Sequence, residues 1–185
     1  MLRTLLFAFA FLAFAGSSAA TEAGWALLRE GGQVVLMRNA YAPGTNDPAS
    51  FDIENCATQR HLSDRGRQQA RRIGALFAAR AEPVEKVLTS RFCRCSATAE
   101  LAFGASTVEQ FPALDYFSGD AEAQAERNAE VVEAIRVFTG SGNLVMVTHL
   151  ETIEALLNVR PREGEAIIVD RSADPLRVAG RIVFN

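Results

Sequence analysis

Residues 143–149 read NLVMVTH, and this short stretch decides the fold class. The run from Asn143 to Thr148 is mainly apolar and has the length of a strand, which is typical of a parallel strand buried on both faces. Residues 33–37, QVVLM, have the same character. Because buried parallel strands need helices on both sides, we expect a sheet that is covered by helices on each face.

The rest of the chain alternates between segments that favour helix and segments that favour strand. The expected helices cover residues 21–30, 63–80, 96–103, 122–138 and 150–157. The expected strands cover residues 33–37, 84–90, 108–111, 143–148, 165–170 and 176–184, the last two as a hairpin. This alternation predicts a single three-layer α/β/α domain with a mostly parallel central sheet, and 185 residues suit one such domain.

The first twenty residues have the pattern of a secretory signal peptide. Arg3 provides a positive charge, residues 5–15 are uncharged and apolar, and Ser18-Ala19-Ala20 offers small residues for cleavage after Ala20. Eleven apolar residues fall short of the roughly 20 that a membrane-spanning helix needs. We therefore expect residues 21–185 to form a domain that is periplasmic or secreted and is not inserted in the membrane.

Export affects the expected state of the three cysteines. In an oxidising compartment a disulfide is favoured, and Cys56 is expected to pair with Cys93 or Cys95. A zinc site is the rival interpretation, but three cysteines and two histidines in no C-x-x-C arrangement support it poorly. We expect no metal and no cofactor.

The charge balance excludes one class of partner. The chain has 19 basic and 22 acidic residues, a formal net charge of −3. A protein that binds duplex nucleic acid needs a strongly basic face, so we expect no nucleic-acid partner.

Polar residues that suit an anion follow three of the expected strands. These are Arg38-Asn39 after the first strand, Ser90-Arg91 and then Arg94 after the second, and Thr148-His149 after the fourth. Ligands bind beyond the carboxyl ends of strands in open α/β sheets, and guanidinium groups match phosphate well. The sequence therefore predicts a pocket for phosphate or a phosphorylated small molecule.

Four stretches, in this order along the chain, resemble the histidine phosphatase superfamily, the phosphoglycerate mutase-like proteins, in its exported phosphatase-type branch. They are Val35-Leu36-Met37-Arg38 with Ala40, residues 62–70 (LSDRGRQQA), Cys93-Arg94-Cys95 with Thr98-Ala99, and Val147-Thr148-His149.

The resemblance implies a mechanism in which a histidine after the first strand accepts the phosphoryl group. Two arginines and a second histidine complete the pocket, and an acidic residue protonates the leaving oxygen. Arg38 matches the first arginine, Arg94 the second arginine, and His149 the second histidine. The position of the nucleophile holds Asn39.

This departure leads us to expect a phosphate-binding protein with impaired turnover. The carboxamide nitrogen of Asn39 is neither basic nor nucleophilic, because its lone pair is delocalised into the carbonyl group. Two alternatives stay open at this point. One is an active phosphomonoesterase that uses another nucleophile or water, and the other is a non-catalytic binding module of the cell envelope.

Four further residues are candidates for minor roles. The resemblance places Asp115 in the stretch that holds the family's acid, and Glu151 competes with it for that role. His61 is a candidate substitute nucleophile, although an ordinary loop histidine is the favoured interpretation. Arg91 is expected to be a salt-bridged surface residue rather than part of the pocket rim.

Overall fold

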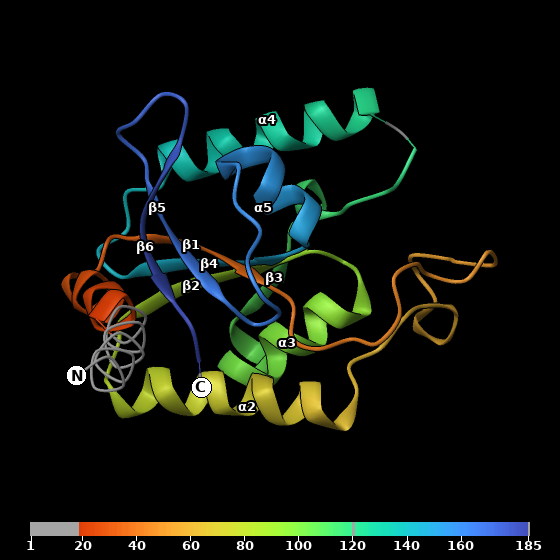
Figure 1. The fold of residues 1–185 in the computed structure, drawn as a ribbon, viewed down its shortest axis with the longest axis horizontal. Helices are drawn as coiled ribbons and strands as arrows, with labels where there is room; N and C mark the ends of the chain where they lie inside the picture. Colours follow the sequence, from red (N-terminus) through yellow and green to blue (C-terminus); the bar gives the residue numbers. More distant parts are fainter. Residues whose placement is uncertain (1–18, 120, 185) are drawn as a thin grey trace, which may run out of the picture.

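The central sheet contains six strands in the order β3-β2-β4-β1-β5-β6 in a computed structural model that describes residues 19–119 and 121–184 (Figure 1). The strands are β1 (Val34–Arg38), β2 (Val84–Thr89), β3 (Val108–Gln110), β4 (Asn143–Thr148), β5 (Ala166–Asp170) and β6 (Arg177–Ile182). Pairs β1–β4, β2–β4 and β2–β3 are parallel, whereas β5 is antiparallel to both β1 and β6. The predicted mostly parallel sheet with a terminal hairpin is confirmed.

Helices cover both faces of this sheet. They are α2 (Asp64–Ala79), α3 (Cys93–Phe103), α4 (Ala121–Val137) and α5 (Leu150–Leu157), and an N-terminal helix includes residues 19–30. Figure 1 shows α2 and α3 below the sheet and α4 and α5 above it. The three-layer α/β/α architecture predicted from the alternation of elements is therefore the observed one.

The two faces of the sheet bury separate hydrophobic cores. In β1, Val35 and Met37 pack with the N-terminal helix, α2 and α3, whereas Val34 and Leu36 pack with α4 and α5. All four side chains are fully buried. Successive side chains of a strand point to opposite faces, so a strand that is apolar throughout fits only between two layers.

The beginning of α2 follows the local sequence closely. The Ser63 hydroxyl accepts a hydrogen bond from the Gly66 N–H at 3.1 Å, which satisfies one of the free donors of the first turn. The stripe Ala70, Ile73 and Phe77 is buried, as the helical periodicity predicts.

The beginning of α3 differs from the prediction by three residues. The helix starts at Cys93 instead of Ser96, and the Ser96 hydroxyl donates to the Ser90 carbonyl at 3.1 Å. The consequence for the site is that Arg94 lies in the first turn of α3 rather than in a loop.

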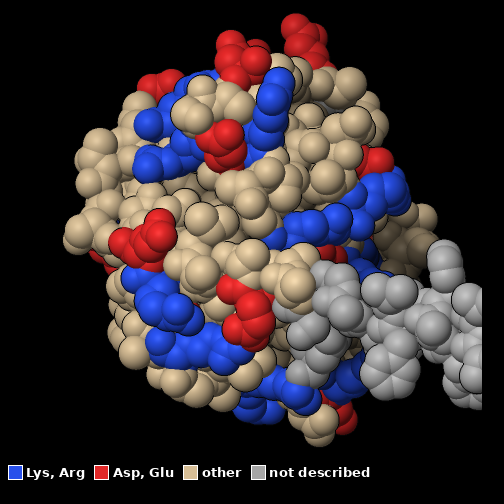
Figure 2. All heavy atoms as spheres, turned by 60° about the vertical axis from the view of Figure 1, so that its left-hand side comes forward, with Lys and Arg blue, Asp and Glu red and all other residues tan. Residues whose placement is uncertain are grey.

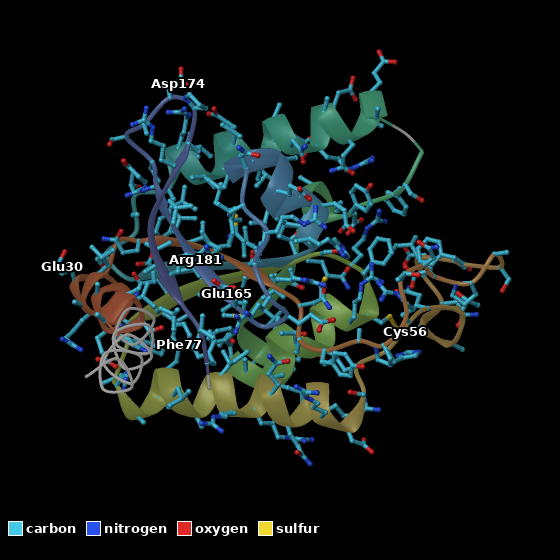
Figure 3. All side chains as sticks on the ribbon, viewed as in Figure 1. Glu30, Cys56, Phe77, Glu165, Asp174 and Arg181 are labelled. Carbon is cyan, nitrogen blue, oxygen red and sulfur yellow. A yellow bond between two sulfur atoms is a disulfide. The ribbon has the colours of Figure 1, made fainter. Side chains whose placement is uncertain are left out.

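A disulfide joins Cys56 to Cys93, with the two Cα atoms 5.8 Å apart. Of the two pairings that the sequence left open for Cys56, the structure therefore has the one with Cys93. Cys95 is a buried free thiol, and burial raises its pKa to about 12. Figure 3 places Cys56 in the loop that projects beyond the carboxyl end of the sheet.

Charged side chains are mixed on the surface of the molecule. On the face drawn in Figure 2, Lys and Arg side chains lie interspersed with Asp and Glu. Some form exposed ion pairs, such as Lys86 with Glu109 at 2.9 Å and Arg136 with Asp174 at 3.0 Å. Exposed pairs of this kind contribute little to stability, so the fold depends on its two cores and on the disulfide.

Most of the predicted signal peptide lies outside the described residues, which begin at Ala19. Cleavage after Ala20 and export therefore stay predictions. Within residues 19–119 and 121–184, none of the helices has both the length and the apolar character needed to cross a membrane.

Candidate functional site

The site lies at the carboxyl end of three neighbouring strands, β2, β4 and β1. Arg38 is paired in register with Thr148, and Thr89 is paired with Val147. The residues that follow these strand ends are therefore side by side. This adjacency is how the sheet gathers three segments that are far apart in the sequence.

A pocket of about 480 Å³ opens at this edge. Arg38, Asn39, Arg94 and His149, the four residues that the sequence assigned to one phosphate site, all line it. Arg60 also lines the pocket, so three guanidinium groups face one cavity. The pocket can accept an anion, because guanidinium donors supply both charge and directed hydrogen bonds.

The hydrogen bonds of His149 determine its tautomer. The Arg94 Nη2 donates to His149 Nδ1 at 3.1 Å, and a guanidinium group has no acceptor, so Nδ1 carries no proton. The proton is then on Nε2, which donates to the Ser90 hydroxyl at 3.0 Å. Ser90 in turn donates to Asp115 Oδ1 at 2.7 Å. This chain of bonds fixes the orientation of the imidazole.

His149 is neutral in this environment. Burial lowers the pKa of His149 well below its ordinary value, and the positive charges of Arg94, Arg60 and Arg38 lower the pKa further. The positive charge of the pocket therefore comes from the arginines.

Arg38 and Asn39 are held by the segment after α5. The Arg38 Nη1 donates to the Pro161 carbonyl at 3.0 Å. The backbone N–H of Asn39 donates to Thr148 O at 3.0 Å, and its carbonyl accepts from Gly164 N at 3.1 Å. Asn39 is 6% exposed, so its carboxamide occupies a fixed place in the pocket wall.

Asp47 occupies part of the donor capacity of the arginines. Its Oδ2 lies 3.0 Å from Arg94 Nη1, and its Oδ1 accepts from the Arg60 backbone N–H at 2.9 Å. The Arg60 Nε atom is 3.9 Å from the same Oδ1. A carboxylate of the protein thus occupies one side of the Arg94 guanidinium group that an incoming anion would use.

The loop that carries Asp47 and Arg60 is tied to α3 at two points. The disulfide joins Cys56 to Cys93, and the Cys93 N–H donates to Gln59 Oε1 at 2.9 Å. Gln59 is itself buried, and its Nε2 donates to two carbonyls of the same loop. These links hold the loop against the helix turn that carries Arg94.

Asp115 does not reach the pocket, as a residue that protonates the leaving group would have to do. It is fully buried and is not among the residues that line the pocket. Oδ1 accepts from Ser90 and from the Arg91 N–H, and Oδ2 accepts from Arg91 Nε at 2.7 Å. With both oxygens engaged, Asp115 orients Ser90 and, through it, His149.

Of the other three candidates for minor roles, one lines the pocket and two do not. Glu151 lines the pocket, together with the carboxylates of Asp47 and Glu163. His61 is exposed and lies outside the pocket lining. Arg91 bonds to Asp115 and lies 3.3 Å from Glu54, so it is the salt-bridged residue that the sequence favoured.

The sequence prediction missed Asp47, Arg60 and Glu163. For Asp47 and Arg60 the available signal was the length of the polar loop over residues 38–60, since such loops are uncommon unless they are functional. Glu163 lies outside this loop, and that signal does not reach it. Among the described residues, no group of three or more His, Cys, Asp or Glu side chains is arranged to hold a metal ion.

Comparison with known proteins agrees with this architecture. Residues 55–118 match the profile of the Histidine phosphatase superfamily (branch 1). This segment contains Arg60, Arg94 and Asp115, and it lies between Asn39 and His149. No curated protein matches the sequence.

Solved structures of phosphatases share the fold. The alpha-ribazole phosphatase from Shigella flexneri is 16% identical with a TM-score of 0.60, and the match covers 83% of this chain and 96% of that one. The protein histidine phosphatase SixA complexed with tungstate is 20% identical with a TM-score of 0.53, covering 81% and 96%.

A third similar structure is a variant of phosphoserine phosphatase from Entamoeba histolytica, with a histidine replaced by alanine, in complex with phosphoserine. It is 12% identical with a TM-score of 0.58, and the match covers 83% of this chain and 98% of that one. At these identities the similarity establishes the fold.

Proposed function

We propose that this chain, whose fold and residues 55–118 are those of the histidine phosphatase superfamily, binds a phosphate group or a phosphoester and turns it over poorly. The observation that carries the proposal is the position of Asn39. It lies in the pocket that Arg38, Arg94 and His149 also line, and it is the position to which the resemblance assigns the phosphoryl-accepting histidine. Guanidinium groups that can bind phosphate are present, and a histidine nucleophile is absent from that position.

The similar structures support the binding part of the proposal. SixA is found with tungstate, a tetrahedral oxyanion, and the phosphoserine phosphatase variant holds phosphoserine although one histidine is alanine. Loss of a histidine is thus compatible with phosphoester binding in this fold. The Cys56–Cys93 disulfide supports the further proposal that the protein is exported, since disulfides persist in oxidising compartments.

Calorimetric titration with inorganic phosphate and with vanadate tests the binding site. We expect Arg38→Ala to weaken binding by about tenfold to a hundredfold, because it removes a charged donor from the pocket wall. Arg136→Ala is the matched control. It removes the same charge from the exposed ion pair with Asp174, so phosphate affinity should stay unchanged. Equal behaviour of the two variants would contradict the proposed site and favour a binding module that retains only the fold.

A second titration tests the competition from Asp47. We expect Asp47→Asn to bind phosphate about tenfold more tightly, because it frees Arg94 and removes a negative charge. An asparagine still accepts the Arg60 N–H through Oδ1, so the loop should keep its shape. Glu151→Gln is the control, since it removes the same charge from the same pocket without freeing Arg94. A gain no larger than that of Glu151→Gln would show that Asp47 does not compete for Arg94.

A further inference from the structure

An aromatic surface forms part of the pocket wall next to the arginines. Phe51, Phe92, Tyr116 and Phe117 all line the pocket. Phe51 belongs to the long loop after β1, Phe92 precedes α3, and the other two follow the short 3-10 helix at Pro112–Leu114. Three separate segments therefore contribute aromatic rings to one cavity. We call these four residues the aromatic wall.

The three phenylalanine rings of the aromatic wall contact one another. Phe51 and Phe92 are stacked, with centroids 5.1 Å apart and planes 10° apart. Phe117 packs against both, with its centroid 5.4 Å from that of Phe92 and 6.2 Å from that of Phe51. Tyr116 lies on the side of His149, at 6.5 Å between ring centroids. The three phenylalanine rings therefore form one continuous apolar surface.

This surface begins where the anion site ends. The Phe92 ring is 4.5 Å from the Arg94 guanidinium carbon and 4.8 Å from the His149 ring. A molecule whose phosphate lies on Arg94 would therefore place its next atoms beside aromatic rings.

The exposure of the wall points to a ligand. Phe92 is 2% exposed and serves as the base, whereas Phe51, Tyr116 and Phe117 are only half-buried. Partly exposed aromatic rings that line a pocket beside a few charged groups are characteristic of sites for small molecules with an apolar part. Flat rings favour flat partners, because offset stacking and edge contacts require planar surfaces.

We propose that the protein selects phosphate esters whose organic part is planar and apolar, an aryl phosphate rather than a sugar or polyol phosphate. The proposal rests on the proposed function of the pocket, because it assumes that Arg38 and Arg94 hold the phosphate group. The aromatic wall then buries the ring of the ester.

Titration with three ligands tests the proposal at a pH at which all of them are dianions: phenyl phosphate, glycerol 2-phosphate and inorganic phosphate. We expect phenyl phosphate to bind at least about tenfold more tightly than glycerol 2-phosphate, the gain expected for burial of one aromatic ring. Equal affinities for these two esters would overturn the aryl preference while leaving phosphate binding intact. Failure of all three ligands to bind would overturn the proposed function and this inference with it.

Variants of the aromatic wall test whether its rings cause the preference for phenyl phosphate. Phe117→Ala should reduce the ratio of phenyl phosphate to glycerol 2-phosphate affinity to near one, and Phe117→Leu should restore only part of it. Phe138→Ala is the matched control. Each of the two phenylalanines is half-buried and has an arginine over its ring: the guanidinium carbon of Arg171 is 5.8 Å from the centroid of Phe138, and that of Arg127 is 5.3 Å from the centroid of Phe117. Phe138, however, does not line the pocket.

The control should keep the affinity ratio of the unmodified protein. If both Phe117→Ala and Phe51→Ala keep the ratio of phenyl phosphate to glycerol 2-phosphate affinity, the aromatic wall is not the cause of the preference. Thermal unfolding of each variant, measured beside the titration, separates a lost contact from a lost fold.

Discussion

The Asn39→His variant is expected to hydrolyse a chromogenic phosphomonoester at least about 10³ times faster than the unmodified protein. An imidazole nitrogen carries a basic lone pair and accepts a phosphoryl group, whereas a carboxamide nitrogen does not. The two arginines and the second histidine are in place, since Arg38, Arg94 and His149 already line the same pocket. The cavity of about 480 Å³ beside residue 39 gives the larger ring room. Steady-state turnover of the two proteins, measured side by side, checks the prediction.

Two controls make this result specific to a nucleophile. Asn39→Gln introduces another carboxamide and should give no gain. His149→Ala, added to Asn39→His, should remove most of the gain, because it deletes a group that lines the phosphate site. Comparable turnover by the unmodified protein and the histidine variant would show that turnover is not impaired. Direct attack by water, or by another nucleophile, would then be the better account.

The second large effect concerns the disulfide. Replacing both Cys56 and Cys93 by serine should lower the free energy of unfolding by about 4 kcal/mol, because the crosslink spans 37 residues and restricts the unfolded chain. Phosphate binding should weaken as well. The loop that the disulfide ties to α3 carries Arg60, whose guanidinium group lines the pocket. Urea unfolding followed by circular dichroism, with a phosphate titration of each protein, measures both effects.

Reductant provides the matched comparison for this prediction. Dithiothreitol should destabilise the unmodified protein to about the level of the double serine variant and should leave that variant unchanged. Cys95→Ala keeps the disulfide, so reductant should destabilise it as it does the unmodified protein. A midpoint of unfolding that reductant does not move would contradict a stabilising role for the Cys56–Cys93 crosslink.

The secondary structure was predictable because its signals are local. The runs at residues 33–37 and 143–148 are mainly apolar, with apolar residues at consecutive positions, and this pattern is typical of strands that are covered on both faces. The Ser63 cap and the stripe of Ala70, Ile73 and Phe77 depend on neighbours within a few residues along one helix. The start of α3 was misplaced by three residues, because its N-cap is Phe92, whose side chain makes no capping hydrogen bond and so gives no local signal.

Part of the site was predictable for a related reason. Arg38, Asn39 and His149 come directly after apolar strands, and parallel strands bring their carboxyl ends to one edge. Arg94 follows the same logic, four residues further on from Ser90 in the first turn of a helix. Asp47 and Arg60 carry no such signal, since their place depends on the path of a long loop and on a disulfide partner that the letters left open.

The order of helices and strands along the chain, the residues that follow the strand ends and the carboxamide at position 39 could all be deduced from the amino-acid sequence. These follow from side-chain periodicity and from chemistry that each residue carries wherever it lies. The bond between Asp47 and Arg94, the place of Asp115 behind Ser90 and the gathering of aromatic rings from three segments emerge from the packed fold. Such contacts join residues far apart in the chain, and their partners are set by the packing of loops rather than by any local pattern.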